Sequence, residues 1–217
     1  MLFEKEIPSP ETVGIVSHDA GGAEIISSWL LQEDKPFIGC LQGPARNIFK
    51  SKLNYSSNHN LEEVISSSQW LLSGSSWQSS LEKHAIKLAQ KLKKPSVVFL
   101  DHWINYEDRF KICNEIVMPQ EIWVGDRYAL KIASECFPEA NLRLVKNPYL
   151  LDLKSNLLKI SKAIQQGIDV LYVCEPVKEH AKIKYGDENF LGYTEEDALL
   201  FFINNLDLMP FLPQKIL

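Results

Sequence analysis

The feature that most constrains the fold is a repeated alternation of short apolar runs with longer helix-like segments. The apolar runs have the length of strands and carry almost no charge, as Ser96–Leu100 (SVVFL) illustrates. Continuous apolar strands are typical of parallel sheets that are covered on both faces. The predicted strands are Thr12–Ser17, Pro36–Leu41, Gln69–Leu72, Ser96–Leu100, Glu121–Gly125, Leu142–Val145 and Asp169–Cys174.

Helix-like segments separate these strands. Within Ser80–Lys93, apolar residues recur at helical spacing. Ser79 and Glu82 have the spacing of a capping box, and Asp126 and Thr194 are predicted N-caps. The predicted helices are Ala23–Gln32, Ala45–Lys52, Leu61–Ser66, Ser80–Lys93, Arg127–Cys136, Leu150–Gln165 and Thr194–Asn205. The pattern therefore predicts an α/β, Rossmann-like fold: a parallel sheet with helices on both faces.

A domain boundary is predicted near Gln165–Asp169, where QQGID closes a helix before a new strand. Residues 1–166 would form an N-terminal Rossmann-like domain. Residues 167–217 would hold the start of a truncated second αβ segment, packed on or beside the first. The C-terminal FLPQKIL is expected to be an unpaired strand, which tends to pair with another chain. We therefore expect a homo-oligomer or a partner chain that completes the second domain.

Composition excludes some functions. The formal net charge is −5, with Lys+Arg 23 against Asp+Glu 28, which argues against a general nucleic-acid binder. No apolar run reaches the ~18 residues of a membrane span, and MLFEKEIPSPE does not have the pattern of a secretory signal. The four cysteines lack C-x-x-C spacing, and three sit in apolar stretches that predict burial. A reducing, cytoplasmic compartment fits them.

Ligands of open parallel sheets bind at the carboxyl ends of the strands, beside helix N-termini. SHDAGGAE follows the first strand, and its Gly21 and Gly22 let the backbone turn tightly near a ligand. His18 and Asp19 stand at the mouth of this turn. The alternative interpretation is a plain β–α turn with a capping aspartate. The stretch is not G-x-G-x-x-G, so it does not indicate a dinucleotide.

A serine-rich stretch, SGSSWQSS, follows the third strand. Its Ser75 and Ser76 offer hydroxyl groups to a phosphate or a sugar. A serine-rich turn that caps the next helix is an equal alternative.

FLDHWINYEDRF places many functional side chains at one strand end. Trp103 and Tyr106 offer flat faces for a sugar ring or a base, and Arg109 can pair with phosphate. The alternative is a loop whose aromatic rings pack into the core and whose charges are solvated. The candidate residues here are Asp101, His102, Trp103, Asn105, Tyr106 and Arg109.

Further polar residues follow later strands. Glu175 stands where a carboxylate could receive a ribose or sugar diol, although a glutamate at a strand end is common. His180 follows on a polar loop. Asp126 is most simply a helix cap, and Asn147 most simply belongs to a turn.

The order of SHDAGGAE, GSSW…LEKHAIKLAQ, FLDHWINYEDRF, EIWVGDRYA and LVKNPY resembles the N-terminal half of GT-B-type sugar-nucleotide enzymes. These include bacterial glycosyltransferases and proteins similar to UDP-N-acetylglucosamine 2-epimerase. The resemblance covers about residues 12–200. It implies a sugar-nucleotide-dependent transferase of surface-polysaccharide biosynthesis, or its acceptor-binding half. The partners would be a nucleotide sugar and a sugar acceptor. No cofactor or metal is predicted.

If the resemblance holds, His18, Asp19, Asp101 and His102 face the cleft from the first domain. Transfer needs a base that takes a proton from the acceptor hydroxyl, and these four residues are the candidates. Because adjacent residues rarely pair, we expect Asp101 rather than Asp19 to orient His18. Arg109 and the helix N-termini would stabilise a diphosphate leaving group. The central hypothesis is that the rings of His18 and His102 meet in one pocket.

Two other functions stay open. The first is a metal-dependent sugar hydrolase or deacetylase, because His18-Asp19 and Asp101-His102 supply nitrogen and oxygen ligands suited to zinc or manganese. The His-Pro-Asp-Asp-Glu loop of zinc deacetylases is only faintly matched, since the proline and the second aspartate are missing. The second is a non-catalytic half-enzyme that still holds a ligand or a partner.

Overall fold

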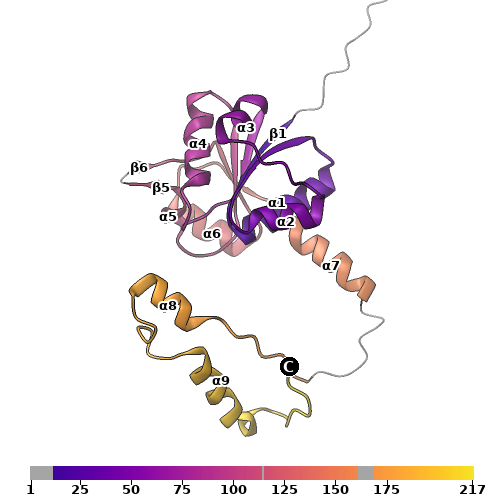
Figure 1. Cartoon of the computed structure of the whole chain (residues 1–217), viewed down its shortest axis with the longest axis vertical. Coiled ribbons are helices and arrows are strands. Elements are labelled where there is room, and N and C mark those ends of the chain that lie inside the picture. The colour runs from indigo at the N-terminus through magenta and orange to yellow at the C-terminus, as the bar shows by residue number, and fades with distance from the viewer. Residues whose placement is uncertain (1–11, 114, 161–168) are drawn as a thin grey trace, which may run out of the picture. The chain divides into compact units, whose positions relative to one another are not determined.

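A computed structural model describes residues 12–113, 115–160 and 169–217 (Figure 1). The chain divides into two compact units, Met1–Leu157 (unit 1) and Leu158–Leu217 (unit 2). The predicted boundary between residues 166 and 167 lies outside the described residues.

Unit 1 is built on a six-stranded parallel sheet with the order β2-β1-β3-β4-β7-β8. A separate antiparallel pair joins β5 to β6. The predicted Rossmann-like α/β fold is confirmed. The strands are β1 (Val13–Ser17), β2 (Phe37–Leu41), β3 (Trp70–Ser73), β4 (Ser96–Leu100), β5 (Lys111–Ile112), β6 (Glu115–Ile116), β7 (Glu121–Val124) and β8 (Leu142–Leu144).

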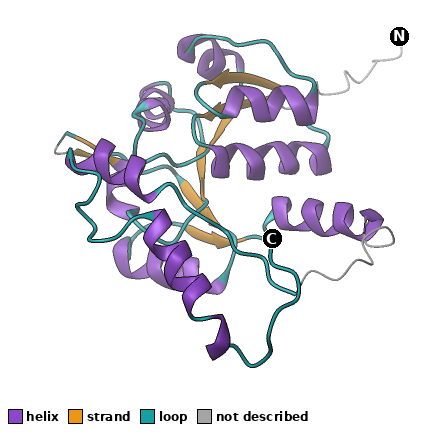
Figure 2. Cartoon of the chain, turned by 60° about the horizontal axis from the view of Figure 1, so that its bottom comes forward, coloured by secondary structure: helices purple, strands orange, loops and turns teal. Residues whose placement is uncertain are grey.

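Helices flank the sheet (Figures 1 and 2). The two faces are visible in β1, where every residue is buried. Ile15 packs in one cluster with residues of α1 and α2, whereas Val16 packs in another with residues of α3 and α4. Successive strand residues point to opposite faces, so this alternation requires apolar layers on both sides. The helices that begin in unit 1 are α1 (Ala20–Glu33), α2 (Ala45–Leu53), α3 (Leu61–Ser67), α4 (Leu81–Lys91), α5 (Tyr106–Phe110), α6 (Arg127–Cys136) and α7 (Pro148–Ile160).

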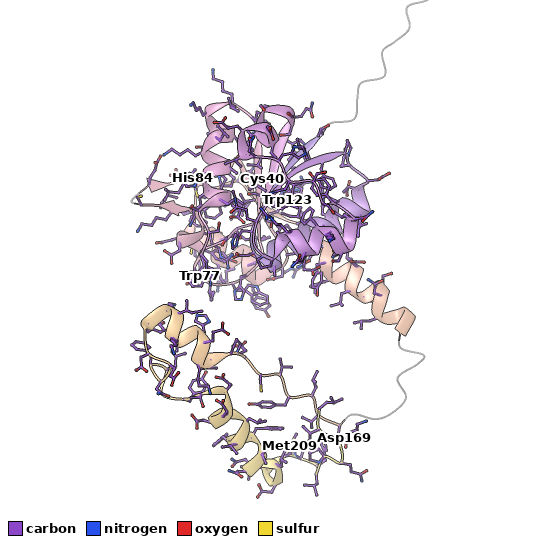
Figure 3. All side chains as sticks on the ribbon, viewed as in Figure 1. Cys40, Trp77, His84, Trp123, Asp169 and Met209 are labelled. Atoms are coloured by element: carbon purple, nitrogen blue, oxygen red, sulfur yellow. The ribbon has the colours of Figure 1, made fainter. Side chains whose placement is uncertain are left out.

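Aromatic packing strengthens one face of this sheet. The indole of Trp29 from α1 lies 5.8 Å from that of Trp70 and 6.0 Å from that of Trp123, between ring centroids. Figure 3 labels Trp123 of this cluster and also Cys40 of β2, both in unit 1. The cluster ties the C-terminal half of α1 to β3 and β7.

Unit 2 has α8 (Val177–Tyr185), α9 (Glu195–Asn204) and the short 3-10 helix η1 (Leu206–Leu208). The predicted strand Asp169–Cys174 was wrong, because only Val170 forms an isolated bridge, with Ile216. The same bridge contradicts an unpaired C-terminal strand. His180 lies on α8, not on a loop.

Local capping chemistry was predicted in part. Asp126 accepts a hydrogen bond from the backbone N–H of Ala129, and Thr194 forms a capping box with Asp197. Both predicted caps are confirmed. These signals act within one turn of helix, so they do not depend on the rest of the fold.

The cysteine prediction was mostly wrong. All four cysteines are free thiols, but only Cys40 is buried; the exposed ones are Cys113, Cys136 and Cys174. None of the helices in the described part of the chain combines the length and the apolar character that a membrane crossing requires.

Candidate functional site

The candidate site lies where the strand order of the sheet reverses, between β1 and β3. The chain leaves β1 toward β2 on one side and later enters β3 on the other, so the loops after β1 and β3 begin side by side at the carboxyl edge of the sheet. A Cβ added at Gly22 would lie only 3.0 Å from Cα of Gly74. Glycine at position 22 is therefore what lets the two loops approach backbone to backbone.

His18 and Asp19 form a side-chain pair at the end of β1. Nδ1 of His18 lies 2.6 Å from Oδ1 of Asp19, and both side chains are partly exposed. The predicted pairing of His18 with Asp101 was wrong. The Cε1–Nε2 edge of the ring faces the turn after β2, where a Cβ at Gly43 would lie 2.9 Å from Nε2. The imidazole is thus held between a carboxylate and a glycine.

Glu82 contacts the backbone of His18, and the sequence did not identify it as a site residue. Its Oε1 accepts a hydrogen bond from the backbone N–H of His18 at 2.7 Å. Its Oε2 is buried and has no hydrogen-bond partner in the described part of the chain. Burial is the main cause that raises the pKa of Glu82 from 4.5 to about 7, although the bond from His18 opposes the rise.

The predicted capping box of Ser79 and Glu82 was also wrong. The N-cap of α4 is Ser80, which makes no side-chain cap bond. Glu82 turns inward instead because it shares a helix face with Ala85, Ile86 and Ala89, all of which are buried. A glutamate followed by apolar residues at i+3, i+4 and i+7 was the sequence signal for this burial.

Asp101 and Arg109 form a nearly enclosed ion pair. Nη1 of Arg109 lies 2.8 Å from Oδ1 of Asp101, and the Arg109 side chain is 4% exposed. The Ser75 hydroxyl donates to the same carboxylate oxygen at 3.1 Å, and Arg109 also donates to the Ser75 carbonyl oxygen. The network joins the loop after β3, the end of β4 and α5. Arg109 is therefore engaged inside the protein and does not present its guanidinium to a diphosphate.

The Asp101 carboxylate also lies against the first turn of α1. A Cβ at Gly21 would overlap its Oδ2, so glycine is needed here as well. A carboxylate at a helix N-terminus is favoured by the helix dipole. Asp101 consequently holds α1, the loop after β3 and Arg109 together, which is a positioning role and not that of a free base.

His102 and Trp103, in the loop after β4, have hydrogen-bond partners other than His18. His102 is exposed, and its Nδ1 accepts the backbone N–H of Trp103. Trp103 is 54% exposed, and its indole N–H donates to Asp126 at 3.0 Å. Among the described residues, no hydrogen bond, ion pair or ring contact joins His102 to His18. The expected meeting of the two imidazoles in one pocket stays a prediction.

The structure also describes three other predicted ligand residues: Tyr106, Asn105 and Ser76. Tyr106 is buried in the core cluster of α4, β4 and α6, and burial raises its pKa to about 12. Asn105 precedes α5 with a positive φ of 57°. Ser76 is buried, and its hydroxyl oxygen accepts the backbone N–H groups of Gln78 and Ser79. For Tyr106, the alternative of a ring packed into the core is observed. Ser76 forms its bonds within the serine-rich turn before α4 and does not cap that helix.

Glu175 belongs to unit 2, before α8. It borders a cavity of about 540 Å³. The other residues that line this cavity are Pro176, Val177, His180, Tyr185, Leu191 and Tyr193. Within the described residues, no three histidine, cysteine, aspartate or glutamate side chains are grouped so that they could hold a metal ion.

The geometry defines a chemical role for one imidazole, that of His18. Asp19 fixes Nδ1 of His18, which leaves Nε2 as the atom that can take or give a proton. Of the four glycines at this end of the sheet, Gly43 is the one whose backbone lies close to the Cε1–Nε2 edge of the ring. No protein-family model, curated protein or solved structure matches the chain.

Proposed function

We propose that unit 1 binds the hydroxylated acceptor of a sugar-nucleotide-dependent glycosyl transfer and that His18 takes the acceptor proton. The observation that carries the proposal is the His18–Asp19 pair, 2.6 Å apart, at the switch point of the sheet. The resemblance of the motifs supports the sugar-nucleotide donor and a cytoplasmic place in surface-polysaccharide synthesis.

In the proposed step, one bond forms at the anomeric carbon of the donor sugar and one bond breaks there. Nε2 of His18 accepts the proton of the acceptor hydroxyl, and the hydroxyl oxygen forms a bond to the anomeric carbon of the donor sugar. The bond from that carbon to the diphosphate oxygen breaks, and the nucleoside diphosphate leaves. Asp19 stabilises the imidazolium that forms, because its carboxylate accepts the N–H at Nδ1.

Glu82 and Asp101 support this geometry without touching the reacting atoms. Glu82 holds the His18 backbone through its N–H, and Asp101 holds the first turn of α1 next to Asp19. A base that is fixed at both its backbone and its ring loses little freedom on binding the acceptor.

The test measures release of nucleoside diphosphate from UDP-, CDP- and GDP-sugars, with and without a mixture of sugar acceptors. We expect His18→Ala to lower the rate by about 10²- to 10⁴-fold, the usual contribution of a general base. His84→Ala is the matched control, because His84 is an exposed histidine on α4. It should leave the rate unchanged.

Three other results would contradict the proposal. Equal rates for wild type and His18→Ala would remove His18 from the mechanism. Tight binding of a nucleotide sugar without turnover would replace transfer by the non-catalytic alternative. Stoichiometric zinc in the purified protein, together with hydrolysis of an N-acetyl sugar, would replace it by the hydrolase.

A further inference from the structure

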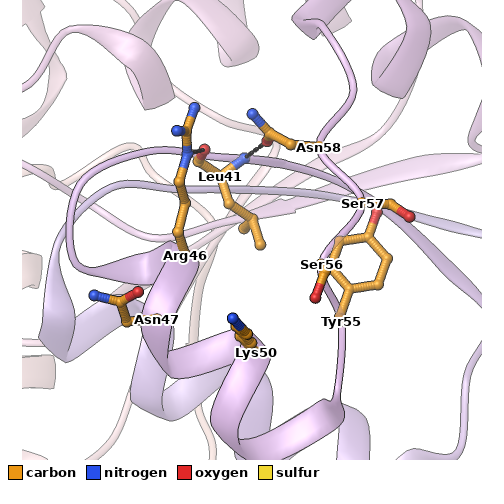
Figure 4. A pocket seen from close by; sticks show the side chains of 8 residues that line it. All are labelled: Leu41, Arg46, Asn47, Lys50, Tyr55, Ser56, Ser57 and Asn58. Carbon is orange, nitrogen blue, oxygen red and sulfur yellow. Dashed lines mark hydrogen bonds between the residues drawn. The ribbon is translucent and has the colours of Figure 1, made fainter.

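A cavity of about 270 Å³ opens at the carboxyl end of β2 (Figure 4). Its walls come from α2 and from residues 55–58, the segment that follows that helix. It shares no lining residue with the His18–Asp19 pair or with the Asp101–Arg109 network. The turn between β2 and α2 separates it from the ring of His18, which Gly43 contacts.

The charge of this cavity is positive. Arg46 and Lys50 line it, and none of its described lining residues carries a carboxylate. The two cations lie four residues apart on α2, so they share one helix face and repel each other. Neither forms an ion pair within the described residues, whereas Lys52, two positions further, pairs with Glu24 at 2.9 Å. Arg46 and Lys50 are both exposed and solvated, and an anion in the cavity would gain a charge-assisted contact with each.

The donors of the cavity are oriented by the end of β2. Nε of Arg46 donates to the carbonyl oxygen of Leu41 at 2.9 Å, and Oδ1 of Asn58 accepts the N–H of Leu41 at 2.8 Å (Figure 4). The first bond holds the guanidinium and leaves its terminal nitrogens for a ligand. The second leaves the amide NH₂ of Asn58 as a further donor.

Tyr55 closes the other side. Its hydroxyl oxygen accepts the N–H of Gly39 at 2.8 Å. Burial raises the pKa of Tyr55, so the hydroxyl stays neutral and keeps its own proton to donate. The cavity therefore gathers cations and neutral donors around one space.

We propose that this cavity binds the phosphate group of a small phosphorylated molecule. The terminal nitrogens of Arg46 match two phosphate oxygens, and Lys50 adds a point charge. The volume of about 270 Å³ is just below the range for ligand sites, roughly 300–1,000 Å³. It suits a monophosphate of the size of a sugar better than a complete nucleotide sugar. The site goes beyond the proposed glycosyl transfer and does not depend on it.

Titration calorimetry of the full chain tests the proposal, with inorganic phosphate, glucose 1-phosphate and glucose as probes at low ionic strength. We expect saturable binding of glucose 1-phosphate and no binding of glucose. Binding by inorganic phosphate of equal strength would identify free phosphate as the ligand; weaker binding would identify a sugar phosphate. In both cases Arg46→Gln/Lys50→Gln should bind at least about tenfold more weakly, because charge-assisted hydrogen bonds are lost.

Lys35→Gln/Lys91→Gln is the matched control, because it removes the same charge from two exposed lysines that form no ion pair in the described part of the chain. It should bind like wild type. If circular dichroism shows that the double variant does not fold, Lys50→Gln alone must still weaken binding about tenfold. The proposal is overturned if neither phosphate probe saturates, if glucose binds equally well, or if the control loses as much affinity as the cavity variant.

Discussion

At the scale of single residues, the environment of a side chain matters more than its type. Glu82, Asp101 and Asp19 are carboxylates near one sheet edge, yet each has a different role. Asp19 contacts an imidazole, Asp101 pairs with Arg109, and Glu82 is buried with one oxygen that lacks a partner in the described structure. For Glu82, burial is the main cause that raises the pKa to about 7.

The raised pKa of Glu82 predicts a stability that falls as pH rises. The unfolded chain releases this proton near 4.5, whereas the folded chain keeps it to about 7. The folded state therefore binds more protons between these values, and stability is lost across this window and stays reduced above it. Glu82→Gln should remove the slope. Relative to wild type, its free energy of unfolding should rise by up to about 3 kcal/mol between pH 4.5 and pH 8.

Urea unfolding of both proteins at several pH values measures this difference. Glu62→Gln, a change at an exposed glutamate of α3, is the control and should leave the slope in place. A difference between Glu82→Gln and wild type that does not vary with pH would show that the buried carboxyl does not titrate in this window.

The buried Asp101–Arg109 pair predicts a large effect of removing one partner. Arg109→Met would leave the Asp101 carboxylate with little exposure and no cation, at a cost of about 3–5 kcal/mol of unfolding free energy. Lys87→Met breaks an exposed pair with Glu115 and should cost less than about 1 kcal/mol. Urea unfolding at pH 7 compares the two. Equal losses would mean that Asp101 and Arg109 are hydrated and contribute no more than a surface pair.

At the scale of elements, the site depends on how closely two strand-to-helix turns approach. The turn after β1 and the turn after β3 meet at Gly22 and Gly74. Their separation is set by the parallel register of β1 with β3, in which Val16 lies opposite Ser73. Side chains at this contact would push α1 away from the sheet edge and move His18 with it.

Gly22→Ala tests this close approach. Near the start of a helix such a change commonly stabilises by about 0.5–1 kcal/mol, because alanine is the better helix former. Here the new Cβ would lie 3.0 Å from backbone, so we expect destabilisation by about 1–3 kcal/mol and lower turnover. The measurement is the melting temperature, which should be lower for Gly22→Ala than for wild type. A more stable Gly22→Ala protein would show that the two turns separate without cost.

At the scale of the whole molecule, the two units differ in how much they bury. Unit 1 has three buried clusters against its sheet. In the described part of unit 2, Ala181 is the one buried residue, and large apolar side chains such as Ile183, Phe201 and Leu212 are exposed. A segment with so little buried apolar surface has little hydrophobic stabilisation of its own.

Limited proteolysis of the full chain should therefore cut unit 2 first. Segments with few buried contacts open at low free energy and expose their backbone to a protease. With a protease of broad specificity, mass spectrometry should find early cuts within residues 169–217 and a persistent fragment that contains residues 12–157. Early cuts inside β1 to β8 would contradict this order.

Part of the fold follows from local patterns alone. The sequence predicted the strands β1, β2, β3, β4, β7 and β8 and the caps at Asp126 and Thr194. It could do so because these features depend on neighbours within one turn or one strand. The prediction of a strand at Asp169–Cys174 was wrong, because an apolar run becomes a strand only where a partner completes its hydrogen bonds. In this segment only Val170 has such a partner.

The sequence by itself determined which residues would follow the strands, and therefore that His18, Asp19 and Asp101 would lie at one edge of a parallel sheet. Only the tertiary structure decided their partners. Asp19 holds His18, Arg109 takes Asp101, and Glu82 reaches His18 from α4 across 64 positions of sequence. Such pairings depend on strand order and on the distance between turns, and local side-chain periodicity carries no information about either.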